Sequence, residues 1–423
     1  MKSRFVIAVA SASALLVALA GCSGSGGSGS ESGASAKIEF QTGQSVDSPL
    51  LTQLKALTKT FEADHPGVAI DLRPSTSTYE SDMKVRLASG NIPDIWWTHG
   101  WSLLRYSKFL TPLQNEAWAK NFNPALAPAM KNASGQFFAF PVDTDVAGII
   151  YNADVLKAAG VDPTTITTWD AFDAAAQKVA ANGVVPITAS GKDNGPAGNL
   201  ADWIAPGAYT KAQLAKLKSG TFLDPQYKTV LDLIAKWKKA GYFNPDYVSA
   251  TSDDMARSLA TGKAAFIFSQ NSTVNNALRY NPKANLAYMP VPSMEGGKPY
   301  LIGGEMNAFG ISKTTKHMKD AKAYIAFLAE PSNAQVLAKA AGSIPGLTNV
   351  KPDLGVLQTS YDTVVKPHTF PLVPYFDRVY LPNGMWNTMV TTADSVVTGG
   401  QANVDSGVAT MSKDFTRLYG QAK

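Results

Sequence analysis

From residue 37 onward, the chain alternates two patterns of apolar residues. Residues 37–40 alternate apolar and polar side chains as a β-strand does, and residues 68–72 are a second expected strand. Between them, residues 50–65 carry apolar side chains at helical spacing. Strands that alternate with helices imply parallel sheets covered by helices on both faces. Because 423 residues are well above the length of one typical domain, we expect an α/β protein of two domains.

The same two patterns continue to the end of the chain, separated by glycines and by turns such as His65-Pro66-Gly67. Beyond the segments above, we expect strands near 92–97, 148–151, 184–187, 264–268 and 309–311, and helices near 81–89, 153–159, 169–181, 227–240, 253–261, 319–329 and 394–419.

The N-terminal residues follow a different plan. Lys2 and Arg4 precede an apolar run over 5–20, which is shorter than the ~20 residues needed to span a membrane and is typical of an export signal. The run ends in Leu19-Ala20-Gly21-Cys22, which resembles the bacterial lipobox. This resemblance implies cleavage before Cys22 and a diacylglyceryl group on its sulfur, and two acyl chains are enough for stable anchoring.

We therefore predict a signal peptide over 1–21 and a lipid-anchored Ser/Gly linker over 22–35. The folded part would then lie at the extracellular face of the bacterial cell membrane, held there by its lipid anchor only. The alternative is that Cys22, the only cysteine of the chain, is a free thiol behind an ordinary signal peptide.

Composition excludes several classes of function. A hydrophobic share of 45% and a charged share of 17% are ordinary for a soluble globular protein. The net charge of +5 is weak and evenly spread, which argues against a nucleic-acid partner. The histidines lie far apart, and neither a GxxxxGK[ST] loop nor a GxSxG elbow occurs. We expect no metal, no cofactor and no catalytic residue.

Several short blocks stand out along the chain: FEADHPGV at 61–68, LASGNIPDI at 87–95, the stretch from Phe140-Pro141 to GIIYN at 148–152, TWDAF at 168–172, GKAAF at 262–266 and Gly303-Gly304. In their order and spacing, these blocks resemble the extracellular solute-binding proteins of the sugar class, family 1, the group that includes maltose-binding protein. The likeness runs from about Lys37 to the end of the chain.

The resemblance implies a two-lobed α/β fold of the periplasmic-binding-protein-like kind, class II type. A multi-strand hinge would join the lobes, and the ligand would lie in the interlobe cleft, which closes by hinge bending. The chain would cross between the lobes near 142–145, 268–271 and 312–314. The first lobe would then combine 36–143 with 270–313, and the second lobe 144–269 with 314–423.

A sugar offers an apolar ring face and a rim of hydroxyls, so its site needs aromatic planes beside fixed hydrogen-bonding groups. The segment WWTHGW at 96–101 follows an expected strand and is the densest case. Because side chains alternate faces along a strand, only one of Trp96 and Trp97 should face the core. We expect Trp97, His99 and Trp101 to contact the ligand. The alternatives are that both neighbouring tryptophans are core residues and that His99 has only a structural role.

Three further candidates rest on the resemblance. Asp145 falls where the family often places an acidic ligand residue, and a carboxylate accepts hydroxyl hydrogens well. Trp203 and Trp386 resemble stacking aromatics of the family. The alternatives are a turn or helix cap for Asp145 and a packing role in the core for Trp203.

Four candidates follow expected strands. Gln270 and Asn271 come one residue after the strand near 264–268 and could bind hydroxyls through their amides. Gly304 would let the backbone approach a ligand, and Glu305 beside it would accept a hydroxyl hydrogen. The alternative for Glu305 is a solvated turn residue.

These observations predict a non-enzymatic, monomeric binding protein that captures an oligosaccharide outside the cell and delivers it to the permease subunits of an ABC importer. Around 98–102 the sequence departs from well-known members, and its low charge favours a neutral sugar. Two alternatives stay open. An exported glycoside hydrolase would need two carboxylates across a scissile bond, drawn from Asp143, Asp145 and Glu305. A binding protein for a non-sugar solute, such as a peptide, is the other.

Overall fold

A mixed sheet forms the framework of the first lobe. The computed structural model describes residues 36–75, 78–193, 195–294 and 296–421, so the predicted signal peptide and linker, with Cys22, lie outside the described residues. The strands of this sheet are β1 (Ala36–Gln41), β2 (Val68–Arg73), β3 (Ile95–Trp97), β4 (Phe140–Pro141) and β11 (Ala308–Ile311). Their order is β2-β1-β3-β11-β4, in which β1 runs parallel to β2 and β3, whereas β11 runs antiparallel to β3 and β4.

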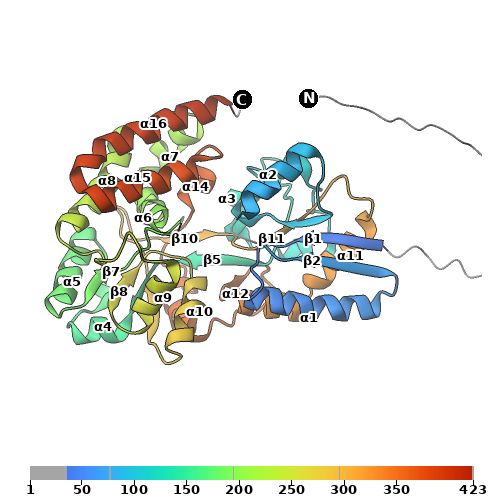
Figure 1. Ribbon diagram of the computed structural model, residues 1–423, viewed down its shortest axis with the longest axis horizontal. Coiled ribbons are helices and arrows are strands. Elements are labelled where there is room, and N and C mark those ends of the chain that lie inside the picture. The colour runs from blue at the N-terminus through green and yellow to red at the C-terminus, as the bar shows by residue number, and fades with distance from the viewer. Residues whose placement is uncertain (1–35, 76–77, 194, 295, 422–423) are drawn as a thin grey trace, which may run out of the picture. The chain divides into compact units, whose positions relative to one another are not determined.

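Helices from two distant parts of the chain complete this lobe. They are α1 (Pro49–Asp64), α2 (Tyr79–Ser89), α3 (Ala127–Met130), α11 (Met318–Leu328) and α12 (Pro331–Ala341) (Figure 1). The α1 helix starts where Ser48 accepts a hydrogen bond from the backbone N–H of Leu51 and where Pro49 fills the first turn. Its buried face includes Leu54 and Phe61, which share a core with the strands and with α11 and α12.

A second sheet belongs to the other lobe. Its strands are β6 (Ile149–Asn152), β7 (Val185–Ile187), β8 (Ala264–Ile267) and β9 (Leu286–Met289), in the order β7-β8-β6-β9. Neighbouring side chains enter different cores: Ile149 and Phe266 join one cluster, whereas Ile150 and Ile267 join another. Because side chains alternate faces along a strand, this division means that both faces of the sheet are covered.

The helices of the second lobe are α4 (Ala153–Ala158), α5 (Trp169–Ala181), α6 (Pro196–Ile204), α7 (Lys211–Lys218), α8 (Asp224–Lys239), α9 (Ser252–Ala260), α10 (Ser272–Tyr280), α13 (Gln358–Ser360), α14 (Phe376–Val379), α15 (Met385–Gly399) and α16 (Val404–Gln421). The α15 helix packs against α6, α8 and α16, and α10 packs against α9. Figure 1 shows α15 and α16 lying over α6 and α8.

A third, short sheet joins the two lobes. It consists of β5 (Asp143–Ala147), β10 (Leu301–Gly304), β12 (Ile344–Pro345) and β13 (Leu372–Pro374), in the order β12-β5-β10-β13. Only Val142 separates β4 of the first sheet from β5, and β10 leads within a few residues into β11. The chain therefore passes from lobe to lobe at both places, and Figure 1 shows β5 and β10 between the two groups of helices.

The lobe boundaries expected from the sequence need correction. The first crossing, near 142–145, agrees with the step from β4 to β5. The segment 270–313, however, divides: α10 packs on α9 and β9 pairs with β6, so the chain stays in the second lobe until β10. Similarly, α11 and α12 pack on the first core rather than the second.

The reason is that hydrophobic periodicity identifies a helix or a strand without identifying the core that it covers. We propose that the first lobe comprises residues 36–142 with 305–350, and the second lobe 143–304 with 351–421. No helix among the described residues is long and apolar enough to cross a membrane.

Candidate functional site

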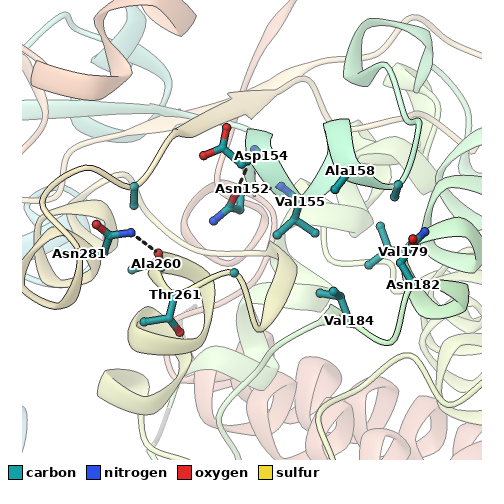
Figure 2. A pocket seen from close by; sticks show the side chains of 13 residues that line it. Asn152, Asp154, Val155, Ala158, Val179, Asn182, Val184, Ala260, Thr261 and Asn281 are labelled. Carbon is teal, nitrogen blue, oxygen red and sulfur yellow. Dashed lines mark hydrogen bonds between the residues drawn. The ribbon is translucent and has the colours of Figure 1, made fainter.

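Two cavities within the described residues differ in chemistry. The first, of about 420 Å³, lies in the second lobe where α4 begins and α9 ends (Figure 2). Its lining holds no aromatic ring, and its amides are already engaged: the Asn281 side chain donates to the carbonyl of Ala260, and the Asn152 side chain caps α4 and donates to Leu259. This lining has neither the stacking surface nor the open hydrogen-bonding groups that a sugar needs.

The second cavity, of about 330 Å³, lies between the two lobes. The first lobe contributes residues that follow β3 and begin α2, and the second lobe contributes residues from α6, α9, α14 and α15. Aromatic, carboxylate, guanidinium and amide groups converge there. The lining residues are Glu80, His99, Trp101, Gly195, Pro196, Asn199, Asp202, Ser252, Met255, Ser269, Gln270, Thr273, Met306, Asp377, Arg378 and Trp386.

On the first-lobe wall, His99 is held in a defined orientation and charge state. Its φ of 49° lies in the left-handed region, which residues other than glycine seldom adopt. The ring packs between Trp97 and Trp101, with centroids 4.8 and 4.5 Å away, and its Nδ1 lies 2.9 Å from the carbonyl oxygen of Met306. Burial, together with the positive charge of Arg378, lowers the pKa of His99 to about 3.

His99 is therefore neutral at ordinary pH, and its tautomer follows from its partner. A carbonyl oxygen only accepts hydrogen bonds, so Nδ1 must carry the proton. Nε2 is then a bare acceptor, suited to a hydroxyl hydrogen.

Two tryptophans line the cavity from opposite lobes. Trp101 belongs to the single helical turn after β3, and the guanidinium of Arg105 lies 3.8 Å from the centroid of its ring. Trp386 is the second residue of α15 and lies against α6 at Gly198. An added Cβ at Gly198 would be 2.6 Å from Val390 Cγ2 and 3.2 Å from the indole, so this glycine allows α15 to pack closely on α6.

Three buried charged residues form the floor of the cavity, and sequence reasoning did not find any of them. The backbone N–H of Asp377 donates to the Asp202 carboxylate at 2.9 Å. Arg378 donates through Nη1 to the carbonyl of Glu305, and its guanidinium lies 4.0 Å from the centroid of the Tyr375 ring. Burial raises the pKa of both aspartates, and repulsion by Asp377 adds to the rise for Asp202.

The sequence holds a signal for Asp202 but none for Asp377 and Arg378. Pro196, Asn199 and Asp202 recur every third residue of α6, so they share one helix face, and that face lines the cavity. Asp377 and Arg378 follow β13, a three-residue strand that ends in proline and does not stand out as a strand in the sequence.

Four of the ten predicted ligand residues line the cavity: His99, Trp101, Gln270 and Trp386. Trp97 is partly buried beside them, with its Nε1 donating to Asn307 Oδ1 at 3.1 Å and its ring against His99. Its neighbour Trp96 is fully buried in a small core cluster, against which Trp97 also packs. Trp96 is therefore a core residue, and Trp97 is the one of the two that is partly exposed.

The expectation that Trp203 stacks on the ligand needs correction. Its side chain has no exposed surface, and its indole N–H donates to the carbonyl of Gly148 at 3.0 Å within the second-lobe core. Trp203 follows Asp202 directly, so it falls on the adjoining face of α6 and points into the core while Asp202 reaches the cavity.

Four other candidates are buried in the hinge sheet or beside it. Asn271 donates to the carbonyl of Val146, while Gly304 pairs with Asp145 across β10 and β5. The Asp145 carboxylate accepts from Tyr375 Oη at 3.0 Å and Ser343 Oγ at 3.3 Å. Since these side chains and Glu305 are fully buried and do not line the cavity, direct ligand contact is not their role in this conformation.

Instead, the hinge carboxylates join separate parts of the chain. Asp143 accepts from the backbone N–H groups of Met306 and Asn307 and from the Asn307 amide, at 3.2, 2.8 and 2.7 Å. Burial raises the pKa of Asp143 to about 7, of Asp145 to about 6 and of Glu305 to about 7. These groups titrate close to neutral pH as a result.

The sequence over residues 48–335 matches the family model described as bacterial extracellular solute-binding protein. The chain belongs to this family. Members of the family and the relatives described below are binding proteins rather than enzymes.

Among curated proteins, this family member is 29% identical over 402 residues to the melibiose/raffinose/stachyose-binding protein MelE of Bacillus subtilis, an alignment that covers 92% of each chain. A solved structure of the putative binding protein MsmE of Bacillus subtilis, in an open conformation, superposes with a TM-score of 0.82 at 28% identity and covers 92% of this chain and 99% of that one. A sugar transporter protein of Bacillus licheniformis in complex with stachyose gives a TM-score of 0.80 at 28% identity, over 90% and 100% of the two chains. The two-lobed fold predicted from the sequence is thereby confirmed.

Proposed function

We propose that this family member captures a neutral oligosaccharide of the raffinose series outside the cell and passes it to an ABC permease. The observation that carries the proposal is the interlobe cavity, where Trp101 and Trp386 supply ring-sized apolar faces beside the carboxylates of Asp202 and Asp377. The neutral Nε2 of His99 adds an acceptor for a hydroxyl. Relatives that bind melibiose, raffinose and stachyose support the class of sugar.

The position of three carboxylates argues against the glycoside hydrolase alternative. Asp143, Asp145 and Glu305 are fully buried and do not line the cavity. Asp202 and Asp377 do line it, so recovery of the unchanged sugar after binding is part of the test. Opposed tryptophans and a cavity of about 330 Å³ also fit a sugar better than an extended peptide backbone.

The test is a thermal-shift and calorimetry screen of the unlipidated chain carrying Cys22→Ser. Melibiose, raffinose and stachyose are compared with maltotriose, a tripeptide and divalent cations. A ligand at 100 times its Kd adds about 2.7 kcal/mol to the unfolding free energy, which raises the Tm of a chain of this size by roughly 3 °C. A shift with raffinose or stachyose, and not with maltotriose, is expected. A shift with the peptide alone, or cleavage of the sugar, would overturn the proposal.

We further propose that Cys22 carries the lipid and that the protein acts as a monomer at the membrane surface. Cells expressing the chain should hold it in the membrane fraction, and Cys22→Ser should move it to the soluble fraction with its sugar affinity unchanged. Equal fractionation of the two would contradict the anchor.

A further inference from the structure

Arg105 of the first lobe contacts one wall of the cavity and reaches a turn of the second lobe, while lying outside the cavity lining. Its guanidinium covers one face of Trp101, and its Nη1 lies 3.0 Å from the Glu80 carboxylate. Its Nε donates across the cleft to Asn383 Oδ1 at 3.0 Å. Asn383 lies in the turn before α15, three residues from Trp386. One side chain therefore joins the aromatic wall of the first lobe to the turn that carries the aromatic wall of the second.

A second contact crosses the cleft in the opposite direction. The guanidinium of Arg378, from the second lobe, lies against Gly100, where an added Cβ would be 2.3 Å from Cζ of that arginine. The φ of Gly100 is −74°, which any residue can adopt, so the backbone itself does not need a glycine here. A side chain at Gly100 would have to displace the buried Arg378 guanidinium.

We infer that these two contacts, Arg105 on Asn383 and Arg378 on Gly100, form an interlobe clasp that holds the cleft closed and slows release of the ligand. The inference rests on the proposed function only in taking the interlobe cavity as the ligand site. Arg105 is a positioning residue in this scheme: it fixes the plane of Trp101 and ties the lobes, and the sugar itself contacts the cavity lining.

The chemistry of the clasp requires arginine. The side chain of Arg105 is 19% exposed, whereas Asn383 is exposed, so their hydrogen bond lies at the solvent-facing edge of the cleft. A planar guanidinium can stack on Trp101 and still donate from Nε and Nη1, which an ammonium group cannot do. Arg105→Lys should therefore behave like Arg105→Ala, whereas a purely electrostatic role would let lysine restore function.

The first experiment tests the clasp without any ligand. Spin labels at Lys55→Cys on α1 and Lys216→Cys on α7, with Cys22→Ser, report the distance between the lobes by double electron–electron resonance; both lysines are exposed. The sugar-free protein should populate a short distance. Arg105→Ala, Asn383→Ala and Gly100→Ala should each lower the share of that short distance. Identical distributions in all four proteins, or no short distance in the wild type, would overturn the inference.

The second experiment measures release of raffinose or stachyose by stopped-flow tryptophan fluorescence. Arg105→Ala should raise the dissociation rate about tenfold and leave the association rate within twofold, because the clasp forms after encounter. The double variant Arg105→Ala/Asn383→Ala should release no faster than the single one. Additive effects would contradict a shared contact.

Arg73→Ala is the matched control, since Arg73 pairs with Glu39 and Asp71 within the first lobe and does not line the cavity. Its release rate should equal that of the wild type. If the wild type binds none of the sugars tested, the proposed function fails, and the distance measurements still decide the clasp.

Discussion

Glu305 follows β10 with its side chain fully buried and with Oε2 lacking a hydrogen-bond partner among the described residues. Burial raises its pKa from the ordinary 4.5 to about 7, although the neighbouring Arg378 opposes the rise. The folded protein thus retains this proton up to about pH 7, whereas the unfolded chain releases it near pH 4.5. Through this group, the unfolding free energy falls as the pH rises between those two values and stays low above them.

We predict that Glu305→Gln stabilises the protein at pH 8 and leaves it nearly unchanged at pH 4.5. Each pKa unit corresponds to about 1.4 kcal/mol, so the gain at pH 8 is up to about 3 kcal/mol. Urea unfolding at pH 5, 6, 7 and 8 should show a shallower decline for this variant than for the wild type. Glu330→Gln, at an exposed position, is the control and should follow the wild-type curve. Parallel curves for Glu305→Gln and the wild type would contradict the assignment.

Substitutions of Trp386 and Trp203 should affect different properties, sugar binding for Trp386 and stability for Trp203. Trp386 is partly exposed on the cavity wall, so Trp386→Ala should weaken sugar binding at least tenfold and change the unfolding free energy by less than about 1 kcal/mol. Trp203 fills the core, so Trp203→Ala should cost about 3–5 kcal/mol of stability and leave the carbonyl of Gly148 unpaired. Calorimetric titration and urea unfolding of both variants measure the two effects. Full sugar affinity in Trp386→Ala would refute its place in the site.

At the scale of one element, α9 shows how a helix end positions the site. Thr251 and Asp254 form a capping box, in which the Thr251 hydroxyl accepts from the Asp254 N–H at 3.1 Å and the Asp254 carboxylate accepts from the Thr251 N–H at 3.0 Å. The turn fixed in this way carries Ser252 and Met255 into the cavity lining. Loss of the cap should therefore loosen the second-lobe wall as well as the helix.

A second helix offers a matched test of that idea. The α7 helix has its own capping box, formed by Thr210 and Gln213, and contributes nothing to the cavity lining. Thr251→Ala and Thr210→Ala should each lower the unfolding free energy by about 1 kcal/mol. Only Thr251→Ala should also weaken sugar binding, by about threefold in a calorimetric titration. Equal affinities in the two variants would mean that the start of α9 is not needed for the site.

The helices and strands also show which features of the fold can be predicted from the sequence and which cannot. The periodicity of 50–65 and 169–181 predicts α1 and α5 closely, because an amphipathic face and a capping residue are both local. Pairing is not local: β9 and β10 follow one another in the chain, yet β9 pairs with β6 and β10 joins the hinge sheet. Aromatic residues after a strand led to Trp101, and the resemblance to the family led to Trp386. Arg378 enters the site through tertiary packing that no nearby pattern indicates.

At the scale of the whole molecule, the two lobes are not independent. The chain passes between them from β4 to β5 and from β10 to β11, and β5 pairs with both β10 and β12 in the hinge sheet. The buried carboxylate of Asp145 ties Tyr375 to Ser343 across that sheet, and Asp143 holds Asn307. Separating the lobes by unfolding one of them would leave these buried groups without partners, at about 1–3 kcal/mol for each group.

We therefore expect the lobes to unfold in a single cooperative transition, despite a length at which separate domains often melt apart. Scanning calorimetry should give one peak, with calorimetric and van't Hoff enthalpies in agreement. Near-ultraviolet circular dichroism, which reports the tryptophans of both lobes, should change at the same temperature as the far-ultraviolet signal. Adding a bound sugar should move the whole transition upward, because it contacts both walls of the cavity. Two peaks, only one of which shifts with sugar, would show that the hinge sheet does not couple the lobes. The variant Asp145→Asn tests whether hydrogen bonding, rather than charge, couples the lobes. It removes the charge of this side chain and retains an acceptor for the Tyr375 hydroxyl, so it should keep the single transition.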